Sequence, residues 1–129
     1  MPQATAGPPT AEDQAPPDLA TMRAAVDRLL DPDAVPVALP PAPDELDALT
    51  LQLRGHLDLL MPTVDELAAR LGKNSIPRYC ALACLGEARR RLKEQPSTEL
   101  GGTLAHARRL ARVLNALCDH FEALAQAAP

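Results

Sequence analysis

Aromatic residues are almost absent from this chain, which has one Phe, one Tyr and no Trp among its 129 residues. A hydrophobic core must therefore be aliphatic, and the Ala and Leu that make up much of the 47% hydrophobic fraction favour helices. Few aromatic rings and a net charge of −4 also disfavour nucleic-acid binding, which uses base stacking and positive charge. We predict an all-α protein and do not expect nucleic acid as a partner, although a short basic recognition helix stays open.

Several other features that identify a function class are missing. No run of 18 apolar residues occurs and the first ten residues lack a basic region followed by an apolar one, so we expect no membrane span, no signal peptide and a cytoplasmic location. The three cysteines, an odd number, cannot form a complete disulfide framework. Ser75 and Ser97, the two serines, fit helix caps, and Gly101-Gly102 lacks the strand and lysine of a phosphate-binding loop. We expect no cofactor.

The strongest pattern in the chain is an apolar stripe between residues 44 and 71. Its members recur every three or four residues, which places them on one face of a helix: Leu46, Leu49, Leu53, Leu57, Leu60, Val64, Leu67 and Leu71. Pro62 lies within the stripe and would destabilise a straight helix by about 3 kcal/mol. Thr63 and Glu66 fit a capping box for a restarted helix, whereas the unbroken phase of the stripe favours one kinked helix. We predict the kinked helix.

The rest of the chain divides into regions by composition. Residues 1–17 contain five prolines and no apolar period, which predicts a disordered tail. Residues 18–31 predict a short helix capped by Asp18, and residues 32–43, again with five prolines, predict an extended linker. Residues 44–129 form the predicted helical bundle domain.

Two more long helices complete the predicted bundle. The first begins at Ser75, ends near Glu94 and has an apolar face of Ala81, Leu85, Ala88 and Leu92. The second runs from a Ser97 cap to about Gln126, with Gly101-Gly102 fraying or bending its first turns. Its core stripe contains Leu100, Leu104, Ala107, Ala111, Leu114, Cys118, Phe121 and Ala125, flanked by Leu110, Leu117 and Leu124. We predict an up-and-down four-helix bundle with three long helices and a short N-terminal one.

Charge is distributed unevenly between these helices. Residues 44–72 carry six acidic residues against two arginines, whereas residues 73–112 carry nine basic residues against three acidic ones. These charges can pair within the bundle or between subunits, or they can leave a basic face for an anionic partner. Pairing within the bundle is the interpretation we favour, because Arg89-Arg90-Arg91 points in three directions around a helix and makes no single patch.

Four segments carry a resemblance to a known family: MRAAVDRLLDPD (22–33), LTLQLRGHLDLLMPTVDELAARL (49–71), RYCALACLGEARRRL (78–92) and HARRLARVLNALCDHFEAL (106–124). Together they resemble an uncharacterised Streptomyces family of small helical proteins. Its members carry a domain of unknown function and are commonly labelled natural product biosynthesis proteins. The resemblance implies an actinobacterial origin and an association with specialised metabolism, and it implies no catalytic residue.

Cysteine and histidine spacing gives one candidate metal site. Cys80 and Cys84 are four residues apart and share one side of a helix, and Cys118 with His120 follows on the next helix. Two thiols and a third thiol or imidazole can bind Cu(I) or Zn(II). The favoured alternative is that all three cysteines pack as small core residues.

His56 is the principal candidate for ligand contact or general-base chemistry, with Arg54 and Asp58 beside it. It lies next to Gly55 and one turn before Pro62, where the stripe changes phase and packing is expected to loosen. The alternative is a surface or half-buried histidine that is hydrogen-bonded to a neighbouring helix.

Three further side chains are candidates for partner or ligand binding. His106 and His120 are 14 residues apart and are predicted on one side of the last helix, at the core boundary. Tyr79 is predicted to point away from the core, either into an interface or against the N-terminal segment.

Two function hypotheses follow from these patterns. The favoured one is a non-catalytic helical protein that binds a partner protein or a small ligand. This protein could also form a homodimer. The alternative is a small cofactor-free enzyme with a pocket between helices near His56. A cavity at the level of His56 would favour the enzyme, and a filled core with an exposed apolar face would favour the binding protein.

Overall fold

The computed structural model describes residues 17–30 and 41–127, and within these ranges it contains four helices and no strand. The helices are α1 (Leu19–Leu30), α2 (Pro43–Ala69), α3 (Ile76–Lys93) and α4 (Gly102–Ala127). This confirms the predicted all-α class. The predicted tail and linker lie outside the described residues, except for Pro17 and residues 41–43. None of the four helices is long and apolar enough to cross a bilayer.

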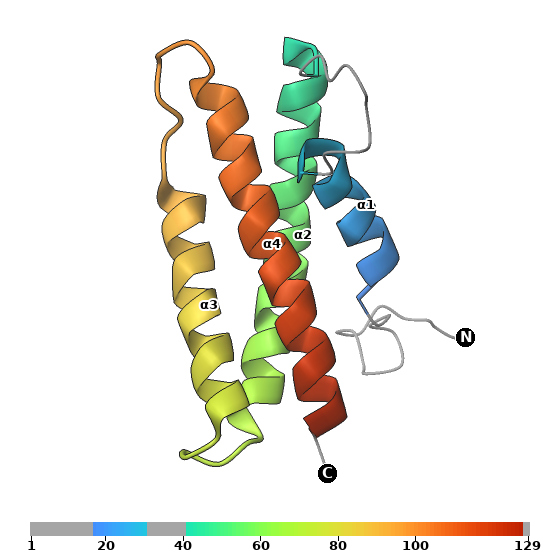
Figure 1. Cartoon of the computed structure of the whole chain (residues 1–129), viewed down its shortest axis with the longest axis vertical. Helices are drawn as coiled ribbons and strands as arrows, with labels where there is room; N and C mark the ends of the chain where they lie inside the picture. Colours follow the sequence, from blue (N-terminus) through green and yellow to red (C-terminus); the bar gives the residue numbers. More distant parts are fainter. Residues whose placement is uncertain (1–16, 31–40, 128–129) are drawn as a thin grey trace, which may run out of the picture.

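The helices alternate in direction, so that α2 and α4 run parallel to each other and antiparallel to α1 and α3 (Figure 1). α4 packs against the other three helices, and its contact with α2 is the most extensive in the bundle. Among the described residues α1 and α3 do not contact each other, because they lie on opposite sides of the α2–α4 pair. The predicted up-and-down arrangement is therefore confirmed, with α2 and α4 in its middle.

The core is aliphatic, as the shortage of aromatic residues predicted. Its largest fully buried side chains come mainly from α2 and α4 and comprise Leu53, Leu57, Leu60, Leu85, Leu110, Leu114, Leu117, Leu124, Val64 and Cys118. On α2 the predicted stripe is buried from Leu46 to Val64, and Leu67 and Leu71 are partly buried. α2 continues through Pro62, so the alternative of a restart at Thr63 is wrong. Burial along both sides of the proline outweighs the one hydrogen bond that it removes.

α1 is fixed to the bundle by a cap, an apolar face and ion pairs. The Asp18 carboxylate accepts hydrogen bonds from the backbone N–H of Thr21 at 3.0 Å and from its hydroxyl at 2.6 Å, which confirms the predicted cap. The buried residues of α1 are Met22, Ala25, Val26 and Leu29. The Arg23 guanidinium donates to Asn115 at 2.8 Å and pairs with Asp119 at 3.0 Å on α4.

The start of α4 differs from the prediction. The Ser97 hydroxyl accepts a hydrogen bond from the Glu99 N–H at 3.1 Å in a turn, and the helix begins only at Gly102. Gly101 adopts a φ of 80°, a left-handed conformation that separates the turn from the helix. Leu100 is consequently 106% exposed, so its predicted place in the core stripe was wrong.

The buried face of α4 is also wider than the predicted stripe. Leu110, Leu117 and Leu124, which were predicted to flank the stripe, are buried, whereas Ala125 is exposed. The reason is that α4 contacts three helices at once, so that residues on both sides of the predicted stripe are covered.

α3 begins at the predicted cap. The Ser75 hydroxyl accepts a hydrogen bond from the Arg78 N–H at 3.2 Å.

Candidate functional site

The three candidate residues around His56 have different surroundings in the described part of the chain. The Arg54 guanidinium donates to the backbone carbonyl of Leu92 at 2.8 Å, which ties α2 to the end of α3. His56 is half-buried, and its Nε2 atom is buried without a hydrogen-bond partner among the described residues. Asp58 is exposed and lines a cavity of about 350 Å³ between α2 and α3, together with Pro62 and Arg89. The three candidates therefore face different surroundings and form no shared site.

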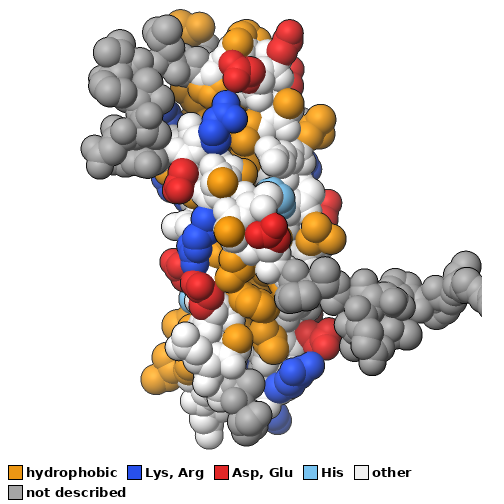
Figure 2. Space-filling view, turned by 90° about the vertical axis from the view of Figure 1, so that its right-hand side faces the viewer, with side chains coloured by type: hydrophobic (Ala, Val, Ile, Leu, Met, Phe, Trp, Pro, Cys, Tyr) orange, Lys and Arg blue, Asp and Glu red, His pale blue; other side chains and the backbone are white. Residues whose placement is uncertain are grey.

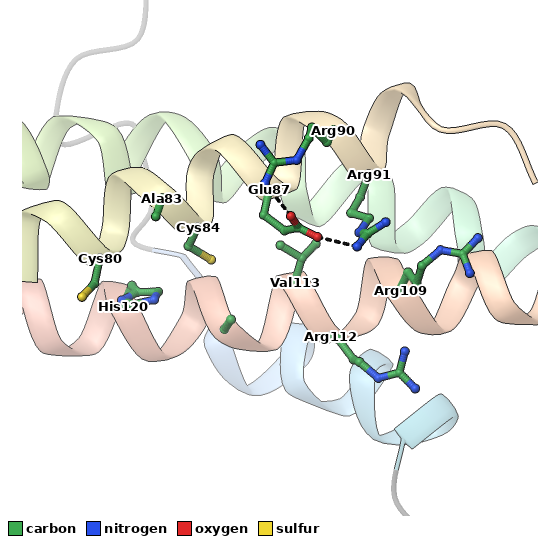
Figure 3. Close-up of a pocket in the computed structure, with 11 residues that line it drawn as sticks. Cys80, Ala83, Cys84, Glu87, Arg90, Arg91, Arg109, Arg112, Val113 and His120 are labelled. Carbon is green, nitrogen blue, oxygen red and sulfur yellow. Dashed lines mark hydrogen bonds and ion pairs between the residues drawn. The ribbon is translucent and has the colours of Figure 1, made fainter.

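The larger cavity is a groove of about 620 Å³ between α3 and α4 (Figure 3). Neither this α3–α4 groove nor the α2–α3 cavity is lined by His56. The groove is lined by Cys80, Ala83, Cys84, Glu87, Arg90, Arg91, Arg109, Arg112, Val113, Ala116 and His120. Cys80, Cys84 and His120 lie toward one end, and the arginines with Glu87 lie toward the other.

Two carboxylates hold the arginines of the basic end in place. Glu87 pairs with Arg90 and with Arg91, each at 2.6 Å. Glu94, which follows α3, pairs with Arg91 at 2.7 Å and with Arg109 at 2.8 Å. Hydrogen bonding from Arg90 lowers the pKa of Glu87, and hydrogen bonding from Arg109 lowers the pKa of Glu94. Both carboxylates therefore stay ionised at neutral pH and fix the guanidinium groups across the groove.

Positive charge still exceeds negative charge at the basic end. Four arginines line the groove, Arg90, Arg91, Arg109 and Arg112, and they outnumber the two carboxylates that pair with them, Glu87 and Glu94. Arg112 makes no ion pair with any residue that the structure describes, and it is exposed. The groove therefore offers positive charge to an anionic group.

The opposite end of the groove combines thiols with small apolar side chains. Cys80 is exposed, Cys84 is half-buried, and all three cysteines of the chain are free. Burial is the main cause that raises the pKa of the Cys84 thiol to about 11, with smaller contributions from Glu87 and Asp119. Cys84 is therefore a neutral thiol at pH 7 and a poor nucleophile.

The predicted metal set of Cys80, Cys84 and Cys118 is not assembled. Cys118 is fully buried in the core and does not line the groove, in agreement with the alternative of a small core residue. Cys84 is only partly buried against the core, and Cys80 is exposed, so for Cys80 the expectation of a core residue was wrong. Within residues 17–30 and 41–127, no three His, Cys, Asp or Glu side chains are grouped so that they could hold a metal ion.

The two histidines of α4 have different surroundings. His120 is half-buried and lines the groove, but His106 is only 2% exposed, so its predicted place at the core boundary was wrong. His106 Nδ1 lies 3.6 Å from Glu94 Oε1 and has no hydrogen-bond partner among the described residues. The end of α3 covers His106, which the spacing within α4 alone could not reveal.

Tyr79 is 74% exposed, as predicted, and lies in an apolar part of α3 that continues beyond the groove. Ile76 is also 74% exposed, and Leu82 is 41% exposed. Between Ile76 and Gly86 the only charged residue is Arg78, whose guanidinium donates to the Leu71 carbonyl at 3.3 Å. This half of α3 is therefore apolar on its exposed side as well as on its buried side.

Sequence reasoning missed the arginines as groove residues. Arg90 and Arg91 of the triplet face the groove, whereas Arg89 lines the α2–α3 cavity, so the triplet does diverge as predicted. The basic end arises because Arg109 and Arg112, three residues apart on antiparallel α4, line the same groove as the arginines of α3. In Figure 3 Arg109 lies opposite Arg91, whereas the Arg112 side chain extends away from α3. The sequence could have predicted this basic end, if the arginines of the last two predicted helices had been aligned with each other in an antiparallel pair.

The free energy of unfolding is expected to fall as the pH drops below about 6.5, partly through His106. Burial is the main cause that lowers the pKa of His106 in the folded state, so the unfolded chain binds the proton more tightly. Urea titrations at pH 7.5, 6.0 and 5.0 should show this decline, above the range in which carboxylates titrate.

His106→Gln should make the decline between pH 7.5 and 5.0 smaller than it is in the wild type. An unchanged decline in His106→Gln would show that burial of this imidazole is not its source. Below this range, protonation of Glu87 and Glu94 adds a further loss of stability, because the folded-state pKa of each is lowered.

The chain belongs to the family of unknown function DUF6415, which matches residues 20–126. A search of curated proteins and a search of solved structures each found no match for this chain. The match spans all four helices, so α3, α4 and the groove between them lie within the family's domain.

Proposed function

We propose that this protein is a non-catalytic helical binding protein, and that its ligand or partner occupies the α3–α4 groove. One observation supports this above the others: the groove of about 620 Å³ joins an arginine-rich end to an apolar end. Ligand sites commonly have this volume, with apolar walls and a few charged groups that fix orientation. The exposed apolar residues Ile76 and Tyr79 next to it point to the same function.

The alternative of a cofactor-free enzyme near His56 has less support. His56 lines neither cavity, and Arg54 is engaged with the Leu92 carbonyl. In the α3–α4 groove, the raised pKa keeps the Cys84 thiol neutral, which disfavours nucleophilic catalysis by this residue. An actinobacterial origin, a link to natural-product biosynthesis and a cytoplasmic location remain part of the proposal and rest on the sequence alone.

A substitution that fills the groove tests the proposal. Ala83 is exposed and lines the groove, so Ala83→Trp should fill it without disturbing the core. Ala48 is also exposed, on α2, so Ala48→Trp is a matched control. Each protein would be purified from its native cells, and mass spectrometry would identify the metabolites and proteins that it retains.

The expected result is a ligand or partner that co-purifies with the wild type and with Ala48→Trp but is lost from Ala83→Trp. Equal retention by all three proteins would place the binding surface elsewhere on the molecule. Retention by none of them would contradict the proposal that the groove holds a stable ligand.

A further inference from the structure

We infer that the groove receives an amphipathic helix of a partner protein, with apolar side chains toward Cys80 and acidic side chains toward Arg112. This inference rests on the proposed function and specifies the chemistry of the occupant. It follows from the shape of the groove, from the position of the exposed apolar residues and from the excess of arginine.

The walls of the groove suit a third helix. α3 and α4 are antiparallel neighbours (Figure 1), and the residues that line the groove follow both helices (Figure 3). From Ile76 to Arg91 it extends over about 22 Å, at about 1.5 Å per helical residue, which a helix of about 15 residues would span. The small side chain of Ala83 and the missing side chain of Gly86 let a partner helix approach α3 closely, and an added Cβ at Gly86 would meet only the Arg90 guanidinium, at 3.8 Å. Apolar anchors at intervals of three or four residues are the usual way in which a helix binds such a groove.

The exposed apolar surface is longer than the cavity. Ile76 and Tyr79 lie seven and four residues before Ala83, so helical periodicity places them on the groove side of α3. On α4 the same periodicity places the exposed residues Ala123 and Ala127 beyond Ala116 and His120. The cavity itself is not lined by any of these four exposed residues. A small molecule within the cavity would leave them exposed, whereas a helix laid along the groove would cover them.

Charge fixes the direction of the occupant. No acidic residue lines the apolar end of the groove itself, and at the other end four arginines outnumber the carboxylates of Glu87 and Glu94 that pair with them. Arg112 has no ion-pair partner among the described residues, so it is available to a carboxylate of the occupant. An acidic end of the partner helix therefore belongs beside Arg112, and its leucine-like residues belong beside Tyr79 and Ala83.

A second copy of this chain fits the surface less well than a different protein does. In a symmetric contact through α3, the large exposed side chains of Ile76 and Tyr79 would pack against their own counterparts. The arginine-rich half would also remain without an acidic counterpart.

Three synthetic peptides of about 18 residues test the inference with the full-length protein. The first carries leucines at intervals of three and four residues and glutamates at one end, the second has lysines in place of the glutamates, and the third has glutamines in place of the leucines. Titrations followed by amide NMR spectra of the isotope-labelled protein should show binding of the first peptide, with shifts confined to α3 and α4. The second peptide should bind at least about tenfold more weakly, and the third should not bind.

Variants of the groove give the matched comparisons. Ala83→Trp should weaken binding of the acidic peptide at least about tenfold and Arg112→Glu about tenfold, whereas Arg112→Lys should stay within about twofold of the wild type. Ala48→Trp on α2 and Arg89→Glu, which alters the α2–α3 cavity, should bind as the wild type does. Circular dichroism of each variant confirms that it is folded.

Three results would overturn the inference. The first is equal affinity for the acidic and lysine peptides, and the second is a set of NMR shifts outside α3 and α4. The third is self-association of the protein in sedimentation that Ala83→Trp abolishes, which would show that a second copy covers the groove. Decanoate, an anionic single-chain amphiphile, serves as a further probe. If decanoate binds the groove and no peptide does, the partner helix is wrong while the proposed binding function stands.

Discussion

Leu57→Ala is expected to lower the free energy of unfolding by about 3 kcal/mol, the largest effect of a single substitution that we predict. Leu57 is 0% exposed and belongs to the fully buried leucines of α2, the helix that packs most extensively on α4. Alanine would lose the burial of most of the leucine side chain and leave a cavity. Neighbouring helices held by contacts on other sides cannot close that cavity completely.

Leu59→Ala is the matched comparison, two residues further along the same helix. Leu59 is 70% exposed, so its replacement should change the free energy of unfolding by less than about 0.5 kcal/mol. Urea unfolding followed by circular dichroism would measure both variants. Similar losses in the two variants would contradict the face of α2 that the structure assigns to the core.

The core of α2 could be predicted because helical periodicity encodes it directly. Leu46 to Val64 recur at the spacing that gathers them on one face, and the structure buries all of them. The same periodicity favoured one kinked helix over a restart at Thr63, and α2 does continue through Pro62, because burial on both sides of a proline outweighs one lost hydrogen bond. The helix caps at Asp18 and Ser75 could also be predicted from the sequence, since each is a contact between residues three apart.

The first residue of α4 could not be predicted from the sequence in the same way. Ser97 has the chemistry of a cap, but its hydroxyl is used in a turn, and Gly101 determines where the helix begins. Leu100 continues the apolar spacing and yet is exposed, because a periodic pattern does not say where the backbone first becomes helical.

The candidate site depended on contacts between helices, which one-dimensional patterns do not contain. Gly55, His56 and Pro62 lie close together in sequence, but Gly55 and Pro62 are exposed and His56 is half-buried, and none of the three brings Arg54 and Asp58 to a common site. The groove instead joins Arg90 with Arg112, which lie on different helices. His106 is buried by the same kind of contact, from the end of α3.

Gly102→Ala is expected to lower the free energy of unfolding by about 2 kcal/mol, because a methyl group has no room at the start of α4. A Cβ on Gly102 would overlap the backbone carbonyl of Ser97, and it would also lie 2.9 Å from the Ser97 Cβ. The obstacle is backbone rather than the end of a flexible side chain, so the turn from Ser97 to Gly101 would have to move. That movement would also disturb the approach of α3 to α4 at the level of Glu94.

Gly55→Ala provides a control of opposite sign. Gly55 is exposed within α2, and an added Cβ there meets no atom within 4 Å, so alanine should stabilise the helix by about 1 kcal/mol. Thermal unfolding of both variants would separate the two effects, since the melting temperature should fall for Gly102→Ala and rise for Gly55→Ala. If both variants gained stability, helix propensity alone would govern each position, and the close contact between Gly102 and Ser97 would be wrong.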